Sequence, residues 1–248
     1  MALLKSIILP PAGAGPATAS VIFAHGLGDS GAGWLDVARM LQQRPKLAHV
    51  RFILPNAPVL PITLNGGMPM PAWFDISSLE DLAGTEDAAG MRKSADALMA
   101  LVQAEADGSA EKLQQAVPSE RVVLGGFSQG GAVSLLAGLT TPLRLAGLIG
   151  LSTWLPLRRS LKPSEHAASL PVLLAHGDAD AVVRTEFGRK TRKYISAGGE
   201  GGAGIGCGEW DAAKVKGVMW KEYRGMGHSA CADEIDDIGE YLEAVIPA

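Results

Sequence analysis

The chain has 248 residues, of which 47% are hydrophobic and 19% are charged, and its formal net charge is -4 at pH 7. These values are typical of an ordinary globular protein and exclude a disordered or fibrous one. Lysine and arginine are scattered along the chain, without the clustered basic surface that phosphate binding needs, so nucleic acid is not an expected partner. Because α/β sheets of this size commonly form one unit, we predict a single domain over residues 1–248.

Several features bear on the compartment. Cys207 and Cys231 form neither a CxxC pair nor a disulfide framework, which suits a reducing environment. The apolar run near the start is short and is interrupted by Lys5, unlike a secretory signal. No stretch approaches the ~18 apolar residues of a membrane-spanning helix. We therefore expect a cytoplasmic protein whose contact with membranes, if any, is transient.

Short runs of β-branched and apolar residues, separated by turns and helical patterns, predict buried strands. They are residues 20–24, 51–54, 121–127, 146–151, 172–176 and 218–223. Apolar residues also recur at helical spacing over 91–102 and 235–245, so each of these segments is predicted to be a helix with one apolar face. Alternating strands and helices predict a mainly parallel central sheet with helices on both faces. In such sheets, ligands bind at the carboxyl ends of the strands.

Two segments interrupt this alternation. Residues 56–82 are rich in proline and show little periodicity. A loop of this length in a compact domain is usually a functional cover or poorly ordered, and we interpret it as a substrate-covering loop. Residues 197–208 are rich in glycine and are predicted to be a flexible surface insertion.

The strongest motif is Gly126-x-Ser128-x-Gly130, between the strand predicted at 121–127 and a helical stretch at 132–139. A serine on a tight turn from strand to helix is exposed at the sheet edge, and the flanking glycines relieve backbone crowding. We interpret Ser128 as a nucleophile, against the alternative of a merely tight structural turn. The first amides of a helix have no intrahelical partner, so the N–H of Gln129 can face a developing oxyanion.

A serine nucleophile needs a base, and in this kind of fold the acid and then the histidine follow the serine along the chain. His228 lies in a glycine-flanked loop after the last predicted strand, and we interpret it as the base. Asp178 and Asp180 both follow the preceding strand, and the pattern alone does not choose between them. His176, which ends that strand, is interpreted as a residue that stabilises the turn.

The second oxyanion donor is expected in the loop after the first predicted strand, where Leu27 or a neighbour can present its N–H. The same loop reads Gly26-x-Gly28-x-x-Gly31, which also matches the dinucleotide-binding fingerprint. However, the next predicted strand ends without an acidic residue for a ribose, and Asp29 would place negative charge beside a pyrophosphate. We therefore expect no cofactor. Without an HExxH motif or paired histidines, we expect no metal either.

Segments spread over nearly the whole chain resemble the acyl-protein thioesterases of the lysophospholipase and carboxylesterase group. They are residues 23–34, 54–58, 72–75, 124–131, 151–156, 176–180 and 227–231. The resemblance implies an α/β-hydrolase fold in which Ser128 is the nucleophile, Asp180 the acid and His228 the base. It also implies that the amides of Leu27 and Gln129 form the oxyanion hole.

The chain departs from the pattern of this group at two places. Ala181 stands where a proline usually follows the triad aspartate, and the glycine-rich stretch at 197–208 looks enlarged. Members of the group remove long acyl chains from protein cysteines and also cleave lysophospholipids and simple esters. The resemblance therefore implies S-acylated proteins and lysophospholipid-like esters as substrates, a transient membrane-surface contact, and a cytoplasmic and also nuclear location.

A long acyl chain needs an apolar groove near the nucleophile. Apolar residues on loops expected near this site are Leu64, Trp73, Phe74, Ile76, Leu79 and Trp154. At ~0.8 kcal/mol per buried methylene, a continuous groove would favour long chains. The alternative is that the large aromatic side chains only pack the loop, since such side chains are usually buried.

Two other functions stay open. A broad-specificity carboxylesterase or lysophospholipase would use the same residues, because the triad determines acyl transfer and not the leaving group. A non-catalytic binding protein that reuses the hydrolase fold would not need all three residue types, and failure of Ser128 to react with a fluorophosphonate would favour it.

Overall fold

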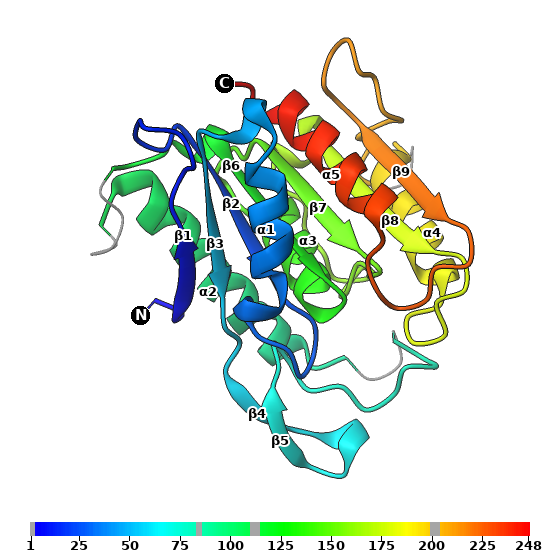
Figure 1. Cartoon of the computed structure of the whole chain (residues 1–248). Helices are drawn as coiled ribbons and strands as arrows, with labels where there is room; N and C mark the ends of the chain where they lie inside the picture. Colours follow the sequence, from blue (N-terminus) through cyan, green and yellow to red (C-terminus); the bar gives the residue numbers. More distant parts are fainter. Residues whose placement is uncertain (1–2, 83–85, 110–114, 199–203) are drawn as a thin grey trace.

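A seven-stranded sheet forms the centre of the computed structural model, which describes residues 3–82, 86–109, 115–198 and 204–248 (Figure 1). Its strands lie in the order β1-β3-β2-β6-β7-β8-β9. Their bounds are β1 Ser6–Leu9, β2 Ala19–Ala24, β3 Val50–Pro55, β6 Val122–Phe127, β7 Gly147–Leu151, β8 Val172–Gly177 and β9 Val218–Tyr223. β1 is antiparallel to β3, and the pairings from β3 to β9 are parallel. The prediction of a mainly parallel sheet is confirmed.

The six predicted strands coincide with β2, β3, β6, β7, β8 and β9 to within one or two residues. Both faces of these strands are covered, which is why they appear in the sequence as continuous apolar runs. In β2, for example, Val21 and Phe23 pack into one layer of the core, and Ile22 and Ala24 pack into the other. β1 was missed, because its four residues are only half-buried and belong to an edge strand.

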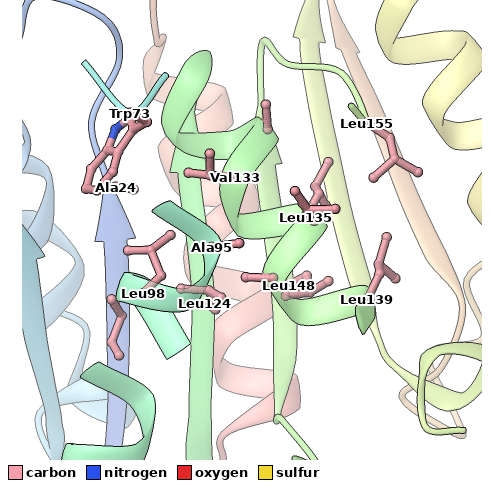
Figure 2. Packing of buried hydrophobic residues seen from close by; sticks show 14 of the residues in the cluster. Ala24, Trp73, Ala95, Leu98, Leu124, Val133, Leu135, Leu139, Leu148 and Leu155 are labelled. Atoms are coloured by element: carbon pink, nitrogen blue, oxygen red, sulfur yellow. The ribbon is translucent and has the colours of Figure 1, made fainter. Parts of the chain in front are cut away.

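Helices cover both faces of the sheet, as predicted (Figure 1). Helices α1 (Leu35–Gln42) and α5 (Ala232–Val245) lie on one face, and α2 (Ala88–Asp107), α3 (Gln129–Thr140) and α4 (Thr185–Ser196) lie on the other. Figure 2 shows the layer under α2 and α3, where Leu98 and Val133 pack against strand residues such as Leu124 and Leu148.

The described residues also contain short 3-10 helices, and these connect the larger elements. They are η1 Gly31–Trp34, η2 Pro45–Leu47, η3 Thr63–Asn65, η4 Ser119–Arg121 and η5 Ala167–Ser169. In the part of the chain that the structure describes, no helix has the length and apolarity needed to cross a membrane.

Residues 56–82 are more ordered than the sequence predicted. Strands β4 (Val59–Ile62) and β5 (Met68–Pro71) form an antiparallel hairpin outside the central sheet, called the hairpin below (Figure 1). Both strands are edge strands, where proline is tolerated because a missing N–H can face away from the partner strand. The expectation of a loop without regular structure is therefore corrected. The two strands are held together by cross-strand hydrogen bonds, which do not require the apolar periodicity that the sequence lacks here.

The predicted glycine-rich insertion at 197–208 falls partly on residues 199–203, which lie outside the described residues. The remainder is tied to α4. The amides of Ile205 and Cys207 donate to the carbonyls of Tyr194 and Ile195 at 2.9 and 3.0 Å. The Cys207 side chain is buried, so this end of the segment packs onto the domain.

Candidate active site

Ser128 occupies the sharp turn from β6 into α3. Its backbone angles are φ 54° and ψ -122°, a conformation that residues other than glycine rarely adopt. The turn is held on both sides, because the Ser128 amide donates to the Leu151 carbonyl at 2.9 Å and the Thr153 hydroxyl donates to the Ser128 carbonyl at 2.7 Å. Strain of this kind persists only where the surroundings fix it, and it is common at active sites.

The two glycines of the motif are required by close backbone contacts. A Cβ atom at Gly130 would lie 2.1 Å from the Ala24 carbonyl oxygen, and one at Gly126 would lie 2.4 Å from the Gly130 carbonyl carbon. Any larger residue would push α3 away from the end of β2. The spacing that the sequence showed around Ser128 therefore has a steric cause.

Three strand ends bring Ser128, His228 and Asp180 together. The His228 Nε2 atom lies 3.0 Å from the Ser128 Oγ atom, and the His228 Nδ1 atom lies 2.7 Å from the Asp180 Oδ2 atom. These residues follow β6, β9 and β8, whose carboxyl ends lie at one edge of the sheet. The Phe127 ring packs 4.7 Å from the imidazole and limits its movement. The arrangement lets the hydroxyl donate to one ring nitrogen while the other ring nitrogen donates to a carboxylate.

The geometry distinguishes the two aspartates that the sequence pattern left open. Asp180 is 5% exposed, and its Oδ1 atom accepts from the amides of Val182 and Val183, each at 2.9 Å. Asp178 is exposed and accepts from the Gly225 amide at 2.6 Å instead. Of the two aspartates, Asp180 is therefore the one that contacts the imidazole of His228.

Asp180 is held in its charged form. Burial alone would raise its pKa, but hydrogen bonds from His176 and His228 and from the Val182 amide outweigh burial and hold the pKa well below its ordinary value. His176 is buried beside it and donates from Nε2 to the Val183 carbonyl at 2.7 Å. His176 thus stabilises the turn that carries Asp180, which is the role its position in the sequence suggested.

The loop after β2 and the turn after β6 leave the sheet side by side. Ala24 pairs with Gly126 in the parallel register, and a Cβ atom at Gly26 would lie 3.5 Å from the Ser128 Cβ atom. The amides of Leu27 and Gln129 have no acceptor among the described residues. Two free N–H groups beside a nucleophilic hydroxyl are the requirement for an oxyanion hole.

The Gln129 side chain contributes a contact that sequence reasoning missed. Its Oε1 atom accepts from the Trp73 amide at 3.1 Å, and its Nε2 atom donates to the Phe74 carbonyl at 3.1 Å. The Gly28 amide also donates to the Pro71 carbonyl at 2.8 Å. The end of the hairpin is therefore attached to both loops that flank Ser128. In the sequence, the only sign of the Gln129 contact is that this residue directly follows Ser128.

The six residues predicted to line an acyl groove do not form one open surface. Trp73, Phe74, Ile76 and Trp154 are 1%, 0%, 7% and 5% exposed, and all four belong to the core beneath α2 and α3. Figure 2 shows Trp73 within this cluster. The Phe74 and Trp154 rings meet edge to face with centroids 6.0 Å apart. The expectation of a groove lined by Trp73, Phe74 and Ile76 is corrected, because packing of large aromatic surface took precedence.

The other two groove residues lie apart from this cluster. Leu64 is 38% exposed in η3, at the tip of the hairpin, and Leu79 is half-buried against the core. A hollow of about 510 Å³ does border Trp154, and it is lined further by Leu155, Phe187 and Tyr194. Charged residues of both signs also line it, namely Asp81, Glu86, Arg158, Arg159 and Lys190.

Comparison with known proteins shows which family the chain belongs to. A family model described as phospholipase/carboxylesterase matches residues 9–205. The chain belongs to the phospholipase/carboxylesterase family. It is 51% identical to the acyl-protein thioesterase 1 of Mycosarcoma maydis over 100% of both chains. It is 42% identical to the acyl-protein thioesterase 1 of Cryptococcus neoformans var. neoformans, over 91% of each.

A solved structure supports the same assignment. The crystal structure of Zea mays acyl-protein thioesterase 2 is similar with a TM-score of 0.73 and 28% identity, covering 98% of this chain and 99% of that one. The predicted α/β-hydrolase fold is therefore confirmed, and so is the prediction that this member of the phospholipase/carboxylesterase family is a hydrolase.

Proposed function

We propose that the chain is a serine hydrolase that removes long-chain acyl groups from S-acylated protein cysteines and also cleaves acyl esters such as lysophospholipids. The observation that carries the proposal is the 3.0 Å contact between the Ser128 hydroxyl and the His228 imidazole, backed by the buried carboxylate of Asp180. The thioester substrate is supported by the full-length similarity to a protein named acyl-protein thioesterase 1.

In the proposed reaction, His228 takes the proton of the Ser128 hydroxyl while the oxygen attacks the thioester carbonyl carbon. The tetrahedral intermediate collapses when the C–S bond breaks and His228 returns the proton to the departing cysteine sulfur. Water then repeats the attack on the acyl-serine and releases a fatty acid and free Ser128. Asp180 keeps the imidazole in the required tautomer and stabilises its cationic form.

Negative charge on the carbonyl oxygen is stabilised by the amides of Leu27 and Gln129. Both are free of other acceptors among the described residues, and one of them is the first amide of α3, where the helix dipole also favours an anion. Each donor is expected to lower the barrier by ~3 kcal/mol, because it acts on charge that develops only in the transition state.

The acyl chain is proposed to enter the hollow beside Trp154. Its walls include the side chains of Leu155, Phe187 and Tyr194, which offer apolar surface to methylene groups. Its charged residues, Arg158 and Lys190 together with Asp81 and Glu86, would face the polar end of an amphiphile. At ~0.8 kcal/mol per buried methylene, such a hollow would favour longer chains over acetyl.

The hairpin is proposed to make the transient membrane contact. Residues 52–74 contain no charged side chain. The hairpin exposes Val59 at 65%, Met68 at 61% and Leu64 at 38%, three of the largest exposed apolar side chains among the described residues. These exposed apolar side chains fit the boundary between lipid head groups and acyl chains, where S-acylated proteins are anchored, although the Asp75 carboxylate accepts from Thr63 at the tip of the hairpin.

The proposal is tested by labelling the protein with a fluorophosphonate and mapping the modified peptide. Labelling at Ser128 and its loss in Ser128→Ala are the expected results, and an unlabelled wild-type protein would favour a non-catalytic binding protein. Hydrolysis of an S-palmitoylated peptide is then compared with that of a lysophospholipid. A clear preference for the lysophospholipid would replace the thioesterase with a broad carboxylesterase or lysophospholipase.

A further inference from the structure

His25, the residue directly after β2, is fully buried and uses both ring nitrogens. Its Nδ1 atom lies 2.7 Å from the Gly26 carbonyl oxygen, and its Nε2 atom lies 3.1 Å from the Ala57 amide nitrogen. The ring therefore links the loop after β2 to the segment that leads into the hairpin. The proposed mechanism assigns no role to this buried histidine.

The two partners fix the protonation of the ring. A peptide N–H only donates, so Nε2 must carry the lone pair that accepts from Ala57. A carbonyl oxygen only accepts, so Nδ1 must carry the proton that it donates to Gly26. Burial lowers the pKa of His25, against smaller opposing effects of Gly26 and Asp29, and this favours the same neutral ring. His25 is therefore the neutral Nδ1–H tautomer.

The Gly26 carbonyl is in the same peptide group as the Leu27 N–H. A peptide group is planar and trans, so fixing the direction of the carbonyl fixes the direction of the N–H, which points the opposite way. The Gly26 oxygen accepts from the Asp29 amide at 3.3 Å as well as from His25. The peptide is thus held from the side opposite to the one on which an oxyanion would lie.

The rest of this loop is held less directly. The Gly28 amide donates to Pro71 at 2.8 Å, and the indole of Trp73 donates to the His25 carbonyl at 2.7 Å. These bonds fix the peptide groups on either side of the Gly26–Leu27 peptide. His25 is the only side chain in the described part of the chain that donates to the Gly26 oxygen. Donation to a carbonyl also polarises its peptide group and strengthens the N–H as a donor.

We propose that His25 is a positioning residue for catalysis, whose Nδ1–H holds the Gly26–Leu27 peptide so that the Leu27 N–H points at the oxyanion. The inference rests on the proposed serine-hydrolase function. It assigns the histidine a role in stabilising the transition state and none in proton transfer. The Leu27 N–H interacts weakly with the carbonyl oxygen of the bound substrate and strongly with the oxyanion of the transition state. Loss of the His25–Gly26 hydrogen bond therefore lowers kcat and leaves KM nearly unchanged.

Two substitutions separate positioning from packing. His25→Asn places an amide N–H near the position of Nδ1 and removes the Nε2 acceptor. His25→Gln places an amide oxygen near the position of Nε2 and removes the Nδ1 donor. Each variant loses one of the two ring hydrogen bonds, so a purely structural role predicts equal effects on activity and on the thermal unfolding midpoint.

The proposal predicts that kcat for an acyl thioester falls ~10-fold to ~100-fold in His25→Gln and stays within about threefold of wild type in His25→Asn. A trifluoromethyl ketone, which adds to Ser128 to form an oxyanion, should lose affinity by a similar factor in His25→Gln, whereas a fatty acid should not. Wild-type kcat in His25→Gln, or equal losses in the two variants, overturns the proposal.

The tautomer of His25 can be measured in the wild-type protein, so this test does not depend on whether a variant folds. In wild-type protein labelled with nitrogen-15, long-range proton–nitrogen spectra should show the His25 ring protonated at Nδ1 and not at Nε2. An Nε2–H tautomer overturns the proposal. Failure of the proposed function is recognised separately, because wild-type protein would then neither hydrolyse thioesters nor label at Ser128, whichever tautomer His25 adopts.

Discussion

Two neighbouring regions of the molecule differ in how their side chains are held. At the catalytic edge, formed by Ser128, Asp180, His228 and the loop that carries Leu27, side chains are buried and directed by hydrogen bonds of 2.7 to 3.0 Å. In the hairpin of β4 and β5, apolar side chains point into solvent without a charge among residues 52–74. The hairpin is attached at its base, through Pro71 and the segment after it.

Under the proposed function, this difference follows from what each region would recognise. A transition state has one geometry, and an error of about 1 Å can cost roughly a hundredfold in rate, so the catalytic edge is built on strand ends of the packed sheet. A lipid surface has no fixed geometry, so exposed apolar area is sufficient there. We therefore expect substitutions at the edge to change chemistry, and substitutions in the hairpin to change access to substrate.

The sharpest contrast is expected within the edge, between its two aspartates. Asp180→Asn keeps the shape but removes the charge that stabilises the imidazolium, and kcat should fall by roughly 10⁴-fold. Asp178→Asn, whose side chain accepts from the exposed Gly225 amide and does not contact His228 in the described part of the chain, should stay within about threefold of wild type. Steady-state kinetics on a soluble thioester decide this, and a comparable loss in Asp178→Asn would contradict the assignment of the acid.

One type of substitution can be compared across the two regions. Gly130→Ala forces a Cβ atom to within 2.1 Å of a backbone oxygen, so it should lower kcat/KM about 100-fold and destabilise the protein by about 3 kcal/mol. Gly67→Ala, in the hairpin, meets no atom within 4 Å and suffers only from its φ of +81°, at about 1 kcal/mol. Urea unfolding and thioester kinetics measure both effects. Equal activity in the two variants would remove the contrast.

The response to pH should come from the packed region, since residues 52–74, which include the hairpin, contain no titratable side chain. Glu234, in the first turn of α5 behind the His228 loop, is fully buried, and its carboxylate oxygens have no hydrogen-bond partner among the described residues. Burial, assisted by the charge of Asp237, raises its pKa to about 8. The folded state therefore retains a proton that the unfolded state loses near pH ~4.3.

Stability should consequently fall as the pH rises from roughly 4.3 to about 8, because the folded state binds more protons over that window. Glu234→Gln removes the ionisation, so the variant should exceed wild type in stability at pH 8 by on the order of 5 kcal/mol and match it near pH 4.5. Glu240→Gln, on the exposed side of the same helix, is the matched control. Parallel stability profiles for the wild type and Glu234→Gln between pH 4.5 and 8 would show that Glu234 does not titrate there.

The smallest expected effect tests the hairpin. Val59→Ser combined with Met68→Ser removes apolar surface that is already exposed, so stability and turnover of a soluble thioester should be unchanged. Activity on an S-palmitoylated peptide in vesicles should fall about tenfold, because less apolar surface is available for the interface. Met40→Ser, at a 50% exposed position on α1, is the control. Equal losses from the hairpin and control variants would separate the hairpin from membrane contact.

Much of the catalytic edge was readable from the sequence because its constraints are local. The glycines around Ser128 are imposed by contacts at two neighbouring strand ends, and they leave a recognisable spacing. The buried strands appear as apolar runs because helices cover both faces of the sheet. The hairpin left no such signal, since its edge strands contain proline, although Leu60, Ile62 and Met70 pack against the core.

By itself, the sequence determined the parallel sheet, the nucleophile turn at Ser128 and the histidine that follows β9, because each depends on neighbours along the chain. Only the tertiary structure decided which aspartate meets His228, that Trp73 and Phe74 belong to the core, and that the buried ring of His25 contacts the Gly26 carbonyl. These outcomes depend on distances between segments far apart in the sequence. Such distances are fixed by packing, which acts on the whole fold at once.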